Sequence, residues 1–176
     1  MLDERSVEGT PSDEAGRWQA LRRSGLLESG TDLMLDAVVH RAAMLFNVPI
    51  AAVGLRDGAR HAFRSSIGLG LPFTSADLAF CGHAIVGKQP FFLLNAQFDS
   101  RFATNAVVHG RPGIRFYAGA PVYGAEGRLL GALCVMDRRA RLHVTPEELA
   151  ALSALAADAA GIFATSAIQI KPERSW

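Results

Sequence analysis

Hydrophobic residues recur at helical spacing near the start of the chain, which predicts two helices there. The first covers residues 13–24 and carries Trp18 and Leu21. The second begins at Thr31 or Asp32, either of which is a good N-cap, and ends before Pro49. One face of this second helix is hydrophobic and is expected to be buried; it carries Met34, Val38, Ala42 and Leu45.

Five later segments have the hydrophobic content and turn boundaries of strands. Residues 49–58 and 60–68 predict a hairpin with its turn at Asp57 and Gly58, and the stretch "PFFLL" predicts a single strand. A second hairpin is expected from "IRFYAGAPVYG" and "RLLGALCVMD". The strands "IAAVGL" and "LLGALCVM" are hydrophobic on both alternating faces, so we expect the sheet to be covered on both sides.

A long helix is predicted at the end of the chain, where Thr145 is the N-cap and Glu148 completes a capping box. Residues 149–168 are long and apolar enough to resemble a membrane span. However, Asp158 in their middle would cost about 3 kcal/mol in a bilayer. We therefore expect a helix of a folded domain and no membrane association.

The last helix has two hydrophobic faces, which suggests two partners. One is the sheet of its own chain, and the other is a second helix, supplied by a homodimer or by the first helix of the same chain. Leu155 and Ile162 lie on one face. The other face has coiled-coil spacing and is the predicted dimer seam: Leu149, Leu152, Ala156, Ala159 and Phe163.

The order of these elements predicts an α+β fold. A mostly antiparallel sheet of about five to six strands would carry the N- and C-terminal helices on one face. An insert over residues 68–113, with a short helix near 76–87, would cover the other face. We expect one domain over residues 13–168, a flexible leader over 1–12 and a tail over 169–176.

The composition limits the classes of partner. The chain has 176 residues, is 49% hydrophobic and has a net charge of +1, so electrostatics favour neither nucleic acid nor an anionic membrane. Its first residues have no basic start and no apolar core, unlike a signal peptide. We therefore expect a cytoplasmic protein in which Cys81 and Cys134 are reduced.

Several motifs together resemble bacterial GAF domains, over about residues 15–165: "AFCGHAI", "DSRFATN", "IRFYAGAPV", "GRLLGALCVMD" and "RARLHVTPEEL". The chain is most similar to the GAF domains that precede histidine kinases and diguanylate cyclases. This resemblance implies a pocket for a small molecule between the sheet and the insert, and a kinase or cyclase output domain as partner. Departures at Ala106 and Ala140, where the family has proline, leave the ligand unidentified.

Alternation along "IRFYAGAPV" assigns its side chains to two faces. Arg115, Tyr117 and Gly119 are expected to face the pocket, with Gly119 leaving space for a ligand. The other face, under the helices, would carry Ile114, Phe116, Ala118 and Ala120. In an alternative interpretation, Arg115 only fixes the cover through hydrogen bonds to loop carbonyls or Asp99. Pro121 predicts that the strand ends, bulges or is unpaired there.

Two further pairs are candidate ligand residues. Phe102 would close the pocket while Arg101 reaches an anionic ligand; alternatively, Arg101 forms a surface ion pair with Asp99. Cys81 and His83 would line the pocket or pack in the core. A catalytic pair between them is disfavoured because residues two apart on a helix point to different faces.

Some members of the family have activities or cofactors that require particular cysteines or histidines. Free methionine sulfoxide reductases rely on cysteines in the cover segment, and residues 88–113 contain none. The cysteine that attaches a bilin is absent from "NAVVHGRPG", so covalent bilin is not expected. No histidine pair has zinc-ligand spacing, while a heme held by His83 or His109 stays open.

These patterns favour a non-catalytic sensory domain that binds an unidentified small molecule and acts through its terminal helices. Two alternatives are kept: a dimerisation module without a ligand, and a redox enzyme that uses Cys81.

Overall fold

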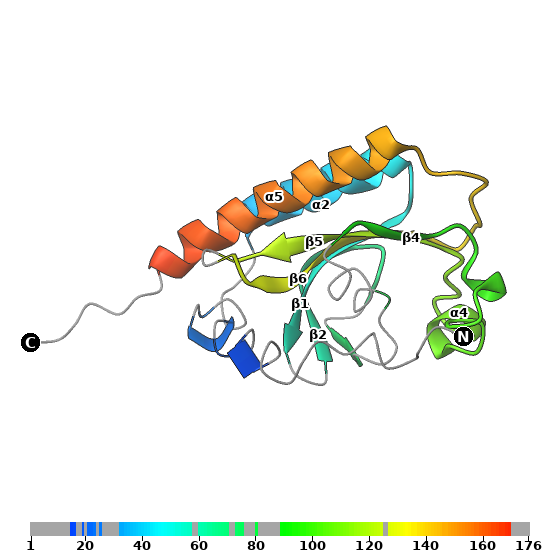
Figure 1. Cartoon of the computed structure of the whole chain (residues 1–176), viewed down its shortest axis with the longest axis horizontal. Coiled ribbons are helices and arrows are strands. Elements are labelled where there is room, and N and C mark those ends of the chain that lie inside the picture. Colours follow the sequence, from blue (N-terminus) through cyan, green and yellow to red (C-terminus); the bar gives the residue numbers. More distant parts are fainter. Residues whose placement is uncertain are drawn as a thin grey trace, which may run out of the picture.

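The computed structural model describes residues 15–16, 19, 21–23, 25, 32–57, 60–70, 73–75, 80, 89–124 and 127–169. Its helices and strands form two layers, with α2 and α5 lying along one face of a sheet (Figure 1). In chain order the elements are α2 (Leu33–Phe46), β1 (Ile50–Asp57), β2 (Arg60–Ile67), β3 (Phe73–Ser75), β4 (Phe91–Leu93), the short 3-10 helix η3 (Ala96–Phe98), α4 (Ala106–His109), β5 (Phe116–Tyr123), β6 (Leu129–Asp137) and α5 (Pro146–Gln169).

The sheet has six strands in the order β3-β2-β1-β6-β5-β4, and each neighbouring pair is antiparallel. This confirms the predicted fold class and both predicted hairpins. The edge strand β3 was not predicted, because its three residues carry no clear alternation. β5 continues through Pro121, which lies past the end of the short edge strand β4, and it bulges one residue later, between Val122 and Tyr123.

Helix α2 is capped by Asp32, one of the two N-cap residues expected from the sequence. The Asp32 carboxylate accepts hydrogen bonds from the backbone N–H groups of Met34 (2.9 Å) and Leu35 (3.4 Å). The helix ends at Phe46, where Asn47 adopts the left-handed conformation with φ 50°. The predicted buried face is partly wrong: Met34 is 65% exposed and Leu45 37% exposed. The buried side chains are Leu35, Val38, Val39, Ala42, Ala43 and Phe46.

Small side chains on β5 let the helices lie close to the sheet. Ala118 and Ala120 are fully buried on the helix side, next to Phe116. The same core cluster contains Leu21, which is helical as expected for the first predicted helix. Trp18 and the helix predicted near residues 76–87 lie outside the described residues, apart from Phe80.

The predicted dimer seam of the last helix packs inside its own chain. Leu152, Ala156, Ala159 and Phe163 belong to the helix-side core, and Leu149 is half-buried. Leu155 is also buried in this core, and Ile162 packs against it. The assignment of this seam to a second subunit is therefore corrected, because α2 and the sheet already occupy both predicted faces of α5.

A second core lies on the opposite face of the sheet, under the segment that follows β4. It includes Tyr117, Cys134 and Met136 from the sheet, and Phe102 and Val108 from the covering segment. The sheet is thus covered on both sides, as the two-faced strands predicted.

Arg141 connects three elements at the start of α5. Its guanidinium donates to the backbone carbonyl of Phe46 at the end of α2 and to Glu148 at 3.3 Å. It also lies over the rings of Phe46 and Phe116, 5.3 and 4.9 Å from their centroids. Glu148 completes the predicted capping box: its carboxylate accepts from the N–H of Thr145 at 2.9 Å.

Helix α5 is also long and apolar enough to span a membrane, judged by length and composition alone. The window Pro146–Ser166 has a mean hydropathy of 1.5, and 28% of it is buried in the structure. A core helix of a globular domain satisfies the same criteria, and α5 packs along the sheet here.

The capping box makes stability depend on pH. Hydrogen bonding from Thr145, with Arg141 nearby, lowers the pKa of Glu148 below its ordinary value. The charged carboxylate therefore stabilises the fold above its unfolded-state pKa of about 4.3, and this contribution is lost as the pH falls through the lower folded-state pKa. We expect Glu148→Gln to cost about 0.5–1 kcal/mol at pH 7, and the difference from wild type to vanish on acidification. Urea unfolding of both proteins at several pH values measures this difference in the free energy of unfolding.

The matched control is Glu147→Gln, which removes the same charge from the same helical turn at an exposed position. A loss of stability equal to that of Glu148→Gln would contradict the role assigned to Glu148.

Candidate functional site

An aromatic cluster lies between the sheet and the covering segment. It consists of Phe80, Phe91, Phe102 and Tyr117. The Tyr117 ring centroid is 5.2 Å from that of Phe80 and 5.9 Å from that of Phe91. Phe102 lies 5.0 Å from Phe80, edge to face, and 6.2 Å from Phe91. The structure brings Tyr117 and Phe102 together on the cover side of the sheet.

Tyr117 occupies the space that Gly119 leaves on the strand. A methyl group added at Gly119 would meet the Tyr117 hydroxyl oxygen at 2.2 Å and its Cζ at 2.8 Å. Two positions apart on β5, the residues share a face, and the tyrosine side chain leans along the strand over the glycine. The space expected for a ligand beside Gly119 is filled by the protein's own side chain.

Arg115 holds the covering segment in place. Its Nη1 donates to the carbonyls of Val108 (2.7 Å), Gly113 (3.2 Å) and Ile114 (3.2 Å). These contacts agree with the alternative interpretation, in which Arg115 fixes the cover through hydrogen bonds to loop carbonyls. Ile114 is corrected: it is buried in the cover-side core, because β5 begins only at Phe116 and strand alternation does not extend back to residue 114.

Arg101 already has a carboxylate partner. Its Nε and Nη2 donate to the two oxygens of Asp99 at 2.9 and 2.7 Å, and this hydrogen bonding raises the pKa of Arg101. The guanidinium lies 5.3 Å from the ring centroids of both Phe91 and Phe102. The Arg101 guanidinium therefore covers the outer side of the aromatic cluster.

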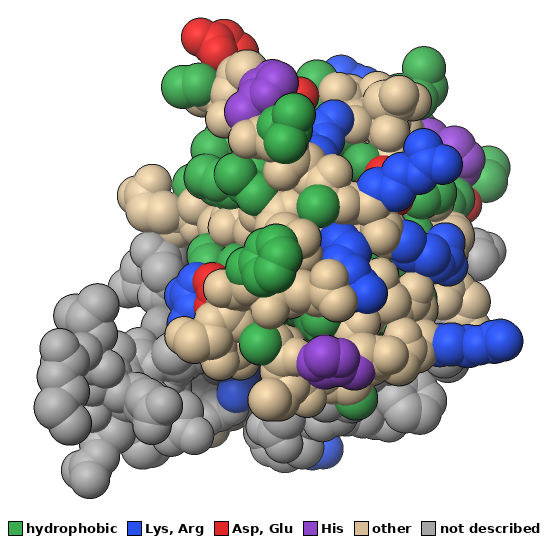
Figure 2. Space-filling model, turned by 90° about the vertical axis from the view of Figure 1, so that its right-hand side faces the viewer, with side chains coloured by type: hydrophobic (Ala, Val, Ile, Leu, Met, Phe, Trp, Pro, Cys, Tyr) green, Lys and Arg blue, Asp and Glu red, His purple; other side chains and the backbone are tan. Residues whose placement is uncertain are grey.

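The surface at the α4 end of the molecule is rich in basic groups. Figure 2 views this end and shows Arg side chains over the middle and right of the face. Arg111, Arg138 and Arg139 are exposed, and Arg138 donates to the carbonyl of Pro112 at 3.0 Å. The arginines near the cover thus hold backbone carbonyls as well as facing solvent.

The thiol and histidine candidates are placed only in part. Cys81 and His83 lie outside the described residues. Cys134 is fully buried on β6, and its thiol donates to the carbonyl of Ala52 at 3.4 Å. His109 is exposed at the end of α4. Within the described ranges, no group of three or more His, Cys, Asp or Glu side chains is placed to hold a metal ion.

Sequence reasoning did not select Phe80 and Phe91, which complete the aromatic cluster. The sequence did contain an indication of both residues. Phe80 is the aromatic residue of the "AFCGHAI" motif, and Phe91 is the first residue of the "FFLL" strand. Alternation alone could not show that rings from these two distant segments meet on the same face.

Comparison with known proteins gives a consistent result. The family model described as GAF domain matches residues 31–162. A protein of Pseudomonas aeruginosa named cyclic di-GMP phosphodiesterase is 42% identical over 142 residues, which are 81% of this chain and 24% of that protein. This chain therefore spans about a quarter of that relative's length.

Two solved structures show the same fold. The GAF domain of an Acinetobacter phosphoenolpyruvate-protein phosphotransferase has a TM-score of 0.62 and 21% identity, covering 88% of this chain and 96% of that one. The free methionine-R-sulfoxide reductase of Neisseria meningitidis, solved with its substrate, has a TM-score of 0.61 and 13% identity, covering 92% and 95%.

The fit between Tyr117 and Gly119 predicts a strong energetic coupling. We expect Gly119→Ala to destabilise the chain by about 1–3 kcal/mol, because the buried tyrosine ring must move against Phe80 and Phe91. In the Tyr117→Leu background the same substitution should cost much less. A double-mutant cycle by urea denaturation measures the coupling. Equal costs in both backgrounds would show that the ring does not fill this space.

Arg115 predicts a second effect, confined to the cover. Arg115→Met keeps much of the side-chain length and loses the three hydrogen bonds to carbonyls. We expect amide hydrogen exchange to rise over residues 105–114 while β1 and β6 stay protected. Arg139→Met, at an exposed position, is the control. Unchanged exchange over residues 105–114 would contradict the role of Arg115.

Proposed function

The chain belongs to the GAF domain family of regulatory signalling domains, and we propose that it senses a small molecule between the sheet and the covering segment. The observation that carries this proposal is the buried Tyr117 ring folded over the bare Gly119 within the aromatic cluster. A side chain that fills such a space can be displaced by a ligand of similar shape, and the strand beneath offers no bulk at Gly119 to oppose it.

The chemistry of the cluster favours a planar, mostly apolar ligand. Its walls are the rings of Phe80, Phe91 and Phe102, which stack on flat groups at favourable geometry. An anionic ligand would have to compete with Asp99, whose two carboxylate oxygens already accept hydrogen bonds from Nε and Nη2 of Arg101. We therefore propose an uncharged ring system as the ligand class.

β5 offers a direct route from the ligand to the output helix. Tyr117 lies on its cover side, while Phe116, Ala118 and Ala120 on its other side belong to the core that α5 packs into. A ligand that moves Tyr117 and shifts β5 would change how α5 packs against the sheet. This is a differential interaction with two states of the domain, as regulation requires.

We propose that the domain controls an output domain in a longer cytoplasmic protein. The Pseudomonas relative, of which this chain matches 24%, is named a phosphodiesterase, and the resemblance to GAF domains that precede kinases and cyclases implies a kinase or cyclase. In this proposal the catalytic step belongs to the output domain, and this chain supplies regulation.

A Cys81-dependent redox enzyme is the competing function, motivated by the fold it shares with the sulfoxide reductase. Under the sensory proposal, Cys81→Ser leaves any turnover of methionine sulfoxide or peroxide unchanged. Loss of a measurable wild-type turnover in this variant would favour the enzyme.

The sensory proposal is tested on protein purified from its own host. We expect native mass spectrometry to show a bound small molecule, with an absorbance scan separating heme, bilin and colourless ligands. Phe91→Ala should weaken retention of that mass about tenfold or more, since it removes a wall of the site. Phe98→Ala is the matched control, because Phe98 is nearby in sequence and 88% exposed.

Removal of the bound molecule should also change hydrogen exchange in α5. The absence of any bound mass, together with unchanged exchange in α5 on adding host small-molecule extract, would reject sensing and favour a purely structural module.

A further inference from the structure

Two exposed arginines meet where the covering segment lies beside the connection to α5. Arg138 follows β6 directly, and its Nε donates to the backbone carbonyl of Pro112 at 3.0 Å, which places this side chain beside Arg111. Both arginines are exposed. The carboxylate of Asp137 is turned back into its own loop, where it accepts the backbone N–H of Arg139 at 3.1 Å. The surface formed by Arg111 and Arg138, the arginine pair, is therefore positively charged.

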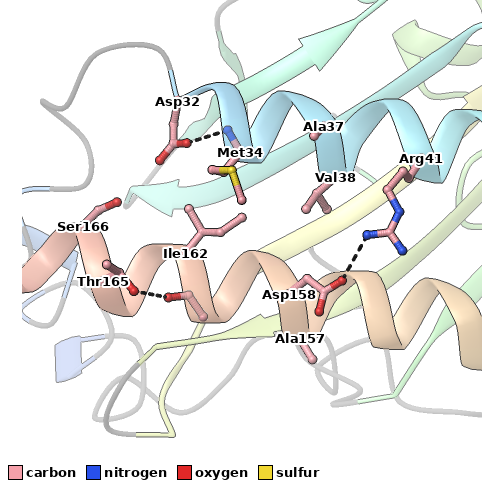
Figure 3. Close-up of a pocket in the computed structure, with 11 residues that line it drawn as sticks. Asp32, Met34, Ala37, Val38, Arg41, Ala157, Asp158, Ile162, Thr165 and Ser166 are labelled. Atoms are coloured by element: carbon pink, nitrogen blue, oxygen red, sulfur yellow. Dashed lines mark hydrogen bonds and ion pairs between the residues drawn. The ribbon is translucent and has the colours of Figure 1, made fainter.

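The arginine pair differs from other arginines of the chain in having no carboxylate partner. Figure 3 shows the contrasting case, an ion pair between α2 and α5. Within the part of the chain that the structure describes, Arg111 and Arg138 form no ion pair. An anionic group can therefore bind them without displacing a carboxylate. Ion pairs of 2.7–3.5 Å hold three other arginines: Arg101 with Asp99, Arg141 with Glu148, and Arg41 with Asp158.

The first residues of the same chain carry the complementary charge. Residues 1–14, the acidic segment, lie outside the described residues and contain five of the chain's 17 acidic side chains but a single basic one, Arg5. The net charge of +1 thus combines a negative segment with a more positive remainder. The acidic residues form two pairs with one residue between them: Asp3 and Glu4, then Glu8, then Asp13 and Glu14.

The length of the acidic segment decides which of these pairs reaches the arginines. Gly16 lies against the guanidinium of Arg128, which precedes β6, whereas Arg138 follows β6. About 30 Å of strand therefore separates Gly16 from the arginine pair. Glu4 lies twelve positions before Gly16, a reach of about 40 Å in an extended chain, while Asp13 has a reach of about 10 Å. Only the first acidic pair is long enough in reach.

We propose that Asp3 and Glu4 bind the arginine pair within the same chain. A guanidinium presents its donors as a planar fork that matches a carboxylate, so two arginines suit two adjacent acidic side chains. An apolar contact is available beside the ion pairs. Leu142, four residues after Arg138, is 94% exposed, and Leu2 precedes Asp3.

This contact would join two parts of the domain that are distant in sequence. Arg111 belongs to the covering segment, and Arg138 belongs to the connection that leads into α5. Exposed ion pairs are individually weak, but a segment of the same chain is present at an effective concentration in the millimolar range. We therefore expect a contact that forms at low ionic strength and is lost at high salt. It does not depend on any ligand under the cover.

A nucleic acid fits this surface less well. Its affinity comes mainly from the number of phosphates that basic side chains neutralise, and the arginine pair offers few such contacts. The acidic segment of the same chain would also repel a phosphate backbone.

Modification of arginine by phenylglyoxal tests the contact in the full chain, with the rate at each site read by peptide mass spectrometry. At about 50 mM salt, we expect Arg111 and Arg138 to react about threefold more slowly in the wild type than in the double variant Asp3→Asn/Glu4→Gln. This difference should disappear at about 0.5 M salt. Arg41, which is paired with Asp158 on the helix layer, should react at the same rate in both proteins.

The matched control is Asp13→Asn/Glu14→Gln, which removes the same charge from positions too close to Gly16 to reach the arginine pair. We expect it to retain the slow modification of Arg111 and Arg138. Equal rates in the wild type and Asp3→Asn/Glu4→Gln, or an equal loss of protection in the control, would overturn the proposal.

Protein concentration distinguishes the sources of any protection. A contact within one chain gives the same modification rates at every concentration, and this is the result we expect. Protection that increases with concentration would instead assign the contact to the acidic segment of another chain. Arginines that react at the variant's rate in the wild type, and are slowed only by added duplex DNA, would identify a nucleic-acid surface and overturn the proposal.

Discussion

The structure depends on a sheet that must be buried on both faces. Strands β1, β5 and β6 form its centre and carry hydrophobic side chains on each side, so neither the helices nor the covering segment alone is sufficient. The two layers have different characters. On the helix side, Ala118 and Ala120 allow α5 to approach closely, whereas the cover side is filled by large aromatic rings. β5 belongs to both cores, which makes it the element through which they can communicate.

Arginine side chains fix the connections around this sheet. Arg115 holds the cover by three carbonyls, Arg141 joins the end of α2 to the start of α5, and Arg101 is paired with Asp99 above the aromatic cluster. A guanidinium suits this work because its donors are fixed in one plane and it stacks on aromatic faces. Arginines that a motif would assign to an anionic ligand are here engaged with the protein itself.

Much of the architecture followed from local patterns. Both hairpins, the Asp32 cap, the capping box at Thr145 and the separation of Tyr117 from Ala118 are set by residues close in sequence, which is why they were predictable. Contacts between elements distant in the sequence were less predictable. Spacing identified the stripe through Leu152, Ala156 and Phe163 but could not distinguish a second subunit from the chain's own sheet. Likewise, alternation placed Gly119 on the same face of β5 as Tyr117 but could not show that Tyr117 leans over it.

The position of the Tyr117 side chain sets a threshold for any molecule that uses the same space. Such a molecule binds only to the fraction of chains in which the ring has moved away, so its apparent dissociation constant equals the intrinsic constant divided by that fraction. The ring thus acts as an internal competitor whose effective concentration is fixed by the fold. Substitutions at Phe80 or Phe91 that alter how firmly the ring is held would shift the concentration range of the response, in addition to changing their own contacts with the incoming molecule.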